Sequence, residues 1–132
     1  MAIREFHVAQ LQEKWRSANP SKAAPLEIAR LRSWHCLVDS CVVGHCTGDS
    51  ISGEIIGLSV VDAYRRQGIG RRLLSLVVEA VRAAGVPRVW VAAPSDPTLP
   101  AYGFYRAVGW VPTGEHTRDG CEILEPRASF RG

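Results

Sequence analysis

The stretch 53–93 constrains the fold of this chain more than any other, because its hydrophobic period changes twice. It opens with an apolar run of strand length that is rich in β-branched residues and predicts a buried strand: Ile55, Ile56, Leu58, Val60 and Val61. The apolar residues then repeat at helical spacing, at positions 69, 73, 77, 81 and 84. Gly85 and Pro87 end this predicted helix, and a second apolar strand follows at 89–93. This order predicts a βαβ unit with parallel strands and a right-handed crossover.

A basic turn joins the first strand to the helix: Arg65, Arg66, Gln67, Gly68, Ile69, Gly70, Arg71 and Arg72. The first turn of a helix has unpaired backbone N–H groups and the positive end of the dipole, so this turn is predicted to bind an anion, above all a phosphate. Gly68 and Gly70 leave the N–H groups accessible, and the arginines add charged donors. The alternative interpretation is a solvated basic helix start with two turn glycines.

Two common nucleotide-binding motifs do not describe this turn. A P-loop needs G-x-x-x-x-G-K-[ST], which the chain lacks. The dinucleotide fingerprint needs a third small residue where Leu73 stands. The turn therefore predicts a phosphate ligand of another kind.

Two motifs stand in order around the βαβ unit. Arg65-x-x-Gly68-x-Gly70 opens the helix, and Ala101-x-x-x-Tyr105-x-x-x-Gly109-Trp110 follows the second strand. They resemble the [QR]-x-x-G-x-[GA] and A-x-x-x-Y-x-x-x-G-F motifs of the GNAT superfamily, the acyl-CoA-dependent N-acyltransferases. Each motif is weak alone, but the two in this order are specific. The resemblance covers residues 34–125.

The resemblance implies an α/β (α+β) fold: a mixed, mostly antiparallel sheet with a central parallel βαβ unit and helices on both faces. It also implies one domain over 1–132, with a variable helical part at 1–33, a core at 34–125 and a tail at 126–132. The residues themselves predict a set of further elements. These are helices at 7–17, 25–32 and 101–108, a hairpin of 33–39 and 41–47 turning at Asp39-Ser40, a turn at 48–50, and a terminal hairpin of 110–115 and 121–125. The resemblance adds a short first strand at 3–6.

The same resemblance places acetyl-CoA on the basic turn, as the acyl donor. Its pyrophosphate would lie on the N–H groups from Gln67 to Arg71, and its pantetheine arm along the exposed backbone of Leu58 and Val60. The implied cofactor-binding residues also include Arg65, Arg66, Gly68, Ile69, Gly70 and Thr98. Thr98 is a departure, since many family members carry Asn there. Asp62, often Pro in the family, is another.

Tyr105 and Glu54 are the candidate catalytic residues. The resemblance implies that Tyr105 protonates the departing thiolate of CoA, whereas its helical spacing alone favours a core aromatic residue. Tyr102 is the weaker substitute. Glu54 precedes Leu58 by four residues, where some branches of the family place a general base. An exposed glutamate at the end of a strand is the alternative.

The implied function is an N-acetyltransferase that moves an acetyl group from acetyl-CoA to a primary amine by direct attack, without a metal. A non-catalytic acyl-CoA-binding or regulatory module with the same fold is one alternative, and a domain that binds the phosphates of another nucleotide is a second. The sequence does not name the amine. The terminal hairpin often mediates dimers in this family, so the resemblance allows a homodimer.

Composition sets broad limits on location and partners. The 132 residues suit one domain, and a net charge of +3 does not argue for a nucleic-acid partner. No apolar run reaches the roughly 20 residues of a membrane helix, and the first ten residues lack a signal-peptide core, so we expect a cytoplasmic protein without a membrane partner. Cys36, Cys41 and Cys46 beside His35 and His45 match no common zinc spacing, so we expect no metal site and reduced cysteines.

Overall fold

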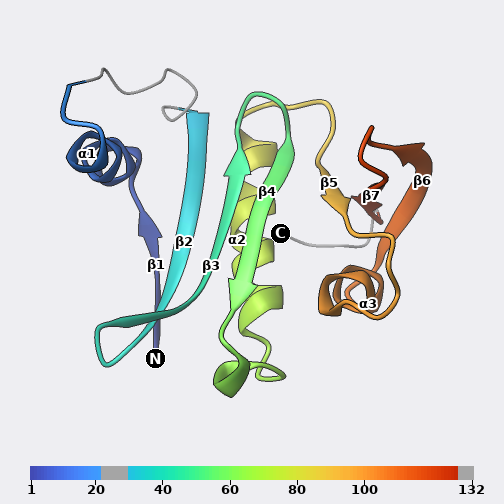
Figure 1. Cartoon of the computed structure of the whole chain (residues 1–132), viewed down its shortest axis with the longest axis horizontal. Coiled ribbons are helices and arrows are strands. Elements are labelled where there is room, and N and C mark those ends of the chain that lie inside the picture. The colour runs from blue at the N-terminus through green and yellow to red at the C-terminus, as the bar shows by residue number, and fades with distance from the viewer. Residues whose placement is uncertain (22–29, 128–132) are drawn as a thin grey trace.

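The computed structural model describes residues 1–21 and 30–127. Seven strands form one sheet in the order β1-β2-β3-β4-β5-β7-β6 (Figure 1). The strands are β1 (Ala2–Phe6), β2 (Leu31–Val38), β3 (Cys41–Asp49), β4 (Glu54–Val60), β5 (Trp90–Ala93), β6 (Trp110–His116) and β7 (Glu122–Pro126). The helices are α1 (Val8–Ala18), the short 3-10 helix η2 (Asp62–Tyr64), α2 (Ile69–Ala83) and α3 (Pro100–Ala107).

The predicted βαβ unit is confirmed. β4 and β5 are parallel, and α2 connects them. The other neighbouring pairs in the sheet are antiparallel, which gives the mixed, mostly antiparallel sheet that the resemblance implies. In Figure 1, α2 runs behind β3 and β4 along almost their whole length.

Small residues on β3 let α2 approach the sheet closely. A Cβ atom added to Gly44 would lie 3.2 Å from Leu73, and one added to Gly48 would lie 2.5 Å from Val77. Cys46, between the two glycines on the same face, is fully buried. The apolar face of α2 therefore packs almost against the backbone of β3.

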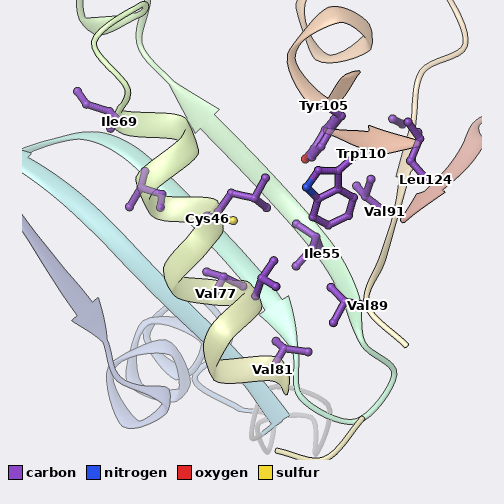
Figure 2. Packing of buried hydrophobic residues seen from close by; sticks show 14 of the residues in the cluster. Cys46, Ile55, Ile69, Val77, Val81, Val89, Val91, Tyr105, Trp110 and Leu124 are labelled. Carbon is purple, nitrogen blue, oxygen red and sulfur yellow. The ribbon is translucent and has the colours of Figure 1, made fainter. Parts of the chain in front are cut away.

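The core lies between α2 and the sheet and continues toward α3. On α2 the buried residues are Ile69, Leu73, Leu74, Val77, Val78 and Val81. Figure 2 shows Ile55, Val89 and Val91 across from the helix, with Tyr105 and Trp110 side by side where α3 meets β6. The predicted positions 69, 73, 77 and 81 are buried, whereas Ala84 is exposed, and the helical spacing did not include the buried Val78.

A different set of side chains occupies the opposite face of the sheet. His35 on β2 and His45 on β3 are cross-strand partners whose ring centroids lie 6.3 Å apart. The Phe6 ring stacks on His35 at 4.5 Å. Burial, together with the nearby His45 and the charge of Lys14 on α1, lowers the pKa of His35. The charge of Lys14 acts on His35 and α1 contacts β2, so α1 lies on this face and helices lie on both sides of the sheet.

Most of the smaller predicted elements are confirmed. The first strand, the first helix, the short helix before Gly109 and the terminal hairpin lie at their predicted positions. Asp39 and Ser40 form the predicted tight turn, both with positive φ, at 50° and 65°.

Three predictions of detail are wrong. Leu31 and Arg32 begin β2 rather than ending a helix, because they pair with β3; the rest of the predicted helix at 25–32 lies outside the described residues. Gly48 and Asp49 belong to β3 rather than to a turn. Ile56 and Val61 are exposed rather than buried, because a register irregularity interrupts the alternation of β4 and Val61 already lies beyond the strand.

None of the helices in the described ranges combines the length and the apolar character needed to cross a bilayer. The four cysteines are free thiols.

Replacing Gly48 with alanine tests the close packing of α2 on β3. The new methyl group would lie 2.5 Å from Val77 Cγ1 and 2.9 Å from Val81 Cγ2, so we expect a loss of about 1–3 kcal/mol in the free energy of unfolding, measured by denaturant titration. Gly57→Ala on β4 is the control, since its new atom would approach nothing closer than His45 at 3.8 Å. Equal stability of the two variants would contradict the packing argument.

Candidate active site

The parallel ladder between β4 and β5 is very short. It pairs Glu54 with Trp90 and Ile55 with Val91. Beyond this point β4 continues to Val60, whereas β5 ends at Ala93. The two strands therefore share a paired end and then lose their hydrogen-bonded contact.

The paired end is held by several contacts. The Trp90 N–H donates to the Gly53 carbonyl, and its indole Nε1–H donates to the Ser52 carbonyl, both at 3.1 Å. Gly53 has φ 81°, and a Cβ there would lie 1.8 Å from the Arg88 carbonyl oxygen. Only glycine fits this crossing of two backbones.

The far part of β4 turns backbone groups away from β3. The Val61 N–H donates to the Val43 carbonyl on β3 at 2.9 Å. Because alternate residues of a strand point their N–H and C=O groups to opposite edges, those of Leu58 and Val60 point toward the β5 side. Past the short ladder, β5 supplies no strand partner for them. Leu58 and Val60 thus present the backbone edge predicted to receive the pantetheine arm.

The basic turn follows this edge. η2 leads to Arg65, Arg66 takes φ 64°, and Gly68 begins α2 as its N-cap with φ 79°. No side chain caps the helix. The first N–H groups of α2, at Ile69, Gly70 and beyond, are thus left for an external acceptor. Gln67, Arg66, Arg71 and Arg72 are exposed around them.

Glycine is required at positions 68 and 70 of the turn for different reasons. Gly68 needs its left-handed backbone, and a Cβ there would meet nothing within 4 Å. A Cβ at Gly70 would lie 3.3 Å from the ring of Phe104 on α3. Ile69, between them, is buried and anchors the turn in the core. Gly70 therefore brings the start of α2 against α3, the helix that carries Tyr105.

Arg65 and Thr98 make local contacts. The Arg65 Nε donates to the Val60 carbonyl at 3.1 Å, and its Nη1 lies 2.9 Å from Asp62 Oδ1. Thr98 lies before α3, where its N–H and Oγ1 donate to Asp96 Oδ1 at 2.9 and 2.7 Å. Thr98 thus belongs to an exposed turn, and its hydroxyl already has an acceptor.

Glu54 lies at the paired end of the two strands. Ile55 packs against α2, so Glu54 points to the opposite face. Burial, reinforced by the negative charge of Asp49, raises the pKa of Glu54. Asp49 is buried and ionised: burial raises its pKa, but the N–H groups of Ser52 and Ile51 and the Arg30 guanidinium outweigh burial and lower it.

Tyr105 lies in the core on the α2 side, with 5% of its surface exposed. Its ring meets those of Phe104 and Trp110 edge to face, with centroids 5.3 and 5.5 Å apart. Burial, and to a smaller extent Cys46, raises the pKa of Tyr105 well above its usual value. The phenol is therefore neutral at physiological pH. Tyr102 instead faces Arg106, whose guanidinium carbon lies 3.7 Å from its ring centroid.

The structure joins some predicted site residues and separates others. The edge of β4, the basic turn and α3 are contiguous, through Arg65 at Val60 and through Gly70 at Phe104. Glu54 and Tyr105 lie toward opposite faces of the sheet. Sequence reasoning missed the contribution of Asp49 to Glu54 and of Phe104 to the turn, since both depend on contacts between distant segments. The three-residue spacing of Asp62 and Arg65 could have signalled their ion pair.

A comparison with protein-family models identifies the family. Residues 1–110 match the model described as the Acetyltransferase (GNAT) family. The chain belongs to this family. It is therefore an acetyl-CoA-dependent N-acetyltransferase, and the resemblance that the two motifs suggested is confirmed. A search of curated proteins finds no significant match to the sequence.

Solved structures support the GNAT fold. The PaiA N-acetyltransferase from Thermoplasma acidophilum, crystallised with coenzyme A, matches with a TM-score of 0.68 and 18% identity over 96% of this chain and 99% of its own. The aminoglycoside N-acetyltransferase AAC(6')-Iy, in complex with CoA, matches with a TM-score of 0.60 and 21% identity over 88% and 96%. The IAA acetyltransferase from Bacillus cereus matches with a TM-score of 0.61 and 16% identity over 94% of this chain and 95% of its own.

In residues 1–21 and 30–127, no group of three or more His, Cys, Asp or Glu side chains is arranged to hold a metal ion.

Replacing Glu54 with glutamine tests the electrostatics of the paired end. A carboxyl whose pKa is higher in the folded than in the unfolded protein destabilises the fold as it ionises. The loss begins as the pH rises past the ordinary value of 4.5 and is complete above the folded pKa. We therefore expect Glu54→Gln to raise the melting temperature at about pH 7 and to change it little at about pH 4.

The control for this variant is Glu79→Gln, at an exposed position on α2. It should show no comparable dependence on pH. If Glu54→Gln changed the melting temperature equally at both pH values, the raised pKa of Glu54 would be contradicted.

Proposed function

We propose that this GNAT chain transfers the acetyl group of acetyl-CoA to a primary amine by direct attack in a ternary complex. The observation that carries the proposal is the end of the parallel ladder after Ile55 and Val91. It leaves the backbone edge of Leu58 and Val60 without a strand partner and leads straight to the uncapped start of α2. An extended pantetheine arm and a pyrophosphate fit these two features in turn.

The cofactor assignment follows from this arrangement. The pyrophosphate lies on the N–H groups between Gln67 and Arg71, where the helix dipole and the exposed Arg66 and Arg71 favour an anion. Gly68 allows the approach, because its left-handed backbone carries no side chain. The arm pairs with the outward N–H and C=O groups of Leu58 and with the N–H of Val60, as a short extra strand would, since the Val60 carbonyl already accepts from Arg65. Thr98 has a weaker claim to the cofactor, since Asp96 already accepts from its hydroxyl.

The chemical step begins with deprotonation of the acceptor. Glu54, directly or through water, takes a proton from the ammonium form of the acceptor. The neutral amine nitrogen attacks the thioester carbon, the C–N bond forms and the C–S bond breaks. Tyr105 gives its phenolic proton to the departing thiolate. The acylated nitrogen gives up its second proton, which returns through water to the Tyr105 phenolate, and Glu54 releases its proton to the solvent. The products are the acetylated amine and free CoA.

The positions of the two candidate residues support this division of labour. Glu54 points to the face opposite α2, and Tyr105 lies on the α2 side. A thioester held between them receives its nucleophile from one face and releases its thiolate toward the other. The raised pKa of Glu54 makes it a stronger base than an exposed glutamate, once ionised. Tyr105 is protonated at physiological pH, and because its pKa is raised it can give its proton only as negative charge develops on the sulfur.

A thermal-shift comparison of acetyl-CoA, free CoA and ATP tests the cofactor assignment. We expect the two CoA compounds to raise the melting temperature by several degrees and ATP to leave it unchanged, because specific binding stabilises the folded state by mass action. Gly68→Glu should abolish the shift, since it places bulk and negative charge at the pyrophosphate. A response of Gly68→Glu equal to that of the wild type would remove the pyrophosphate from this turn.

Tyr105→Phe tests the proposed acid. Removing the hydroxyl should lower turnover on the order of 10²-fold, the typical contribution of a general acid, with little change in acetyl-CoA affinity. Turnover is measured by the appearance of free CoA thiol with a panel of primary amines. Tyr102→Phe is the matched control and should retain activity, because its ring packs against Arg106. An unchanged rate in Tyr105→Phe would exclude the phenol as the proton donor.

A further inference from the structure

Arg65, the first residue of the motif, does not extend toward the open start of α2. Its Nε donates to the Val60 carbonyl at 3.1 Å, and its Nη1 lies 2.9 Å from Asp62 Oδ1. The guanidinium therefore joins the end of β4 to η2. The Arg65 N–H also donates to the Asp62 carbonyl at 3.2 Å, so backbone and side chain are both tied to the same residue.

These contacts lie at the point where the chain reverses. Immediately after Arg65, Arg66 takes φ 64° and Gly68 takes φ 79°, which turns the chain into α2. A non-glycine residue with positive φ is held there by its surroundings. Arg65 is the last residue before this reversal, and its ties to Val60 and Asp62 fix where the reversal begins.

The ion pair has little value for global stability. The side chains of Arg65 and Asp62 are 50% and 89% exposed, and such pairs add little to the free energy of unfolding. The negative charge of Asp62 is also unfavourable for the proposed ligand, because this carboxylate lies beside a proposed site for phosphates. A local role in shaping the turn accounts for a carboxylate at this position.

We infer that Asp62 and Arg65 are positioning residues for the proposed CoA site: Asp62 holds Arg65 against the Val60 carbonyl, and this clamp sets the backbone of the basic turn for the pyrophosphate. The inference rests on the proposed function. It assigns Arg65 to the protein's own backbone rather than to a phosphate. The exposed Arg66 and Arg71 remain as the charged contacts of the turn.

A phosphate-binding role and a positioning role for Arg65 predict opposite changes in CoA affinity when Asp62 is replaced by alanine. If Arg65 meets the phosphate directly, Asp62→Ala frees a cation and removes a nearby negative charge, so CoA should bind more tightly. If Asp62 positions Arg65, the same change should weaken CoA binding, by about tenfold for one charge-assisted contact of roughly 1.4 kcal/mol. Calorimetric titration of the full chain with CoA measures the difference. Glu79→Gln is the control, since it removes one exposed negative charge on α2, away from the turn.

Arg65→Lys provides the second variant. Lysine keeps the charge but cannot bridge a carbonyl and a carboxylate through two separate nitrogens of a planar group. We expect it to weaken CoA binding as much as Asp62→Ala does, and the double variant to be no weaker than either single one. In acetyl transfer, both variants should raise the KM for acetyl-CoA and leave kcat at saturation unchanged. Their melting temperatures should stay close to that of the wild type.

The outcomes separate this inference from the function beneath it. A wild type that does not bind CoA contradicts the proposed function, and the inference falls with it. A wild type that binds CoA, with Asp62→Ala binding equally or more tightly, overturns the clamp alone. Wild-type affinity in Arg65→Lys does the same, because it shows that charge without bidentate geometry is sufficient.

Discussion

The close contact between α2 and β3 is the interaction on which the rest of this structure depends. Gly44 and Gly48 remove the side chains that would hold the helix away, and Val77 takes the space that a Cβ at Gly48 would fill. A helix seated this deeply has little freedom to slide or tilt, because both glycine contacts must be kept at once. The start of α2 is therefore held beside the end of β4, and the basic turn takes its position from a packing contact elsewhere on the helix.

The second constraint is the short parallel pairing between β4 and β5, which stops after Ile55 and Val91. Two residues of β4 pair with β5, and the remainder of the strand keeps its outward N–H and C=O groups unpaired by strands. An unpaired strand edge usually invites aggregation, but here it lies inside the sheet order rather than at its rim. A ligand with amide groups, such as a pantetheine arm, can complete it. The proposed chemistry then needs only one group on each side of the thioester, and Glu54 and Tyr105 are the two residues proposed for these roles.

The sequence predicted what depends on local pattern and missed what depends on contact. The βαβ unit, the first helix and the terminal hairpin follow from periodicity and turn residues, and the structure confirms them. Periodicity could not reveal the irregularity in β4 that exposes Ile56, because a bulge breaks the alternation on which the prediction relies. The motif explained Gly70 by the access of a ligand to the backbone. The structure adds a second explanation, close contact with Phe104, a residue far along the chain. The catalytic roles of Glu54 and Tyr105 stay predictions.

The backbone crossing at Gly53 has a mechanical consequence. With the Arg88 carbonyl packed where a Cβ would stand and Trp90 bonded to the residues before β4, the paired end of the two strands is rigid. Any widening between β4 and β5 must therefore hinge at this paired end. It would displace β7 and β6 together with β5, because these strands are hydrogen-bonded in series. α3 packs on β6, so its Tyr105 would move with them. On the proposed assignment, an acyl chain bulky enough to force the strands apart would also draw the proton donor, Tyr105, away from the sulfur. The close backbone crossing at Gly53 would therefore favour short acyl groups.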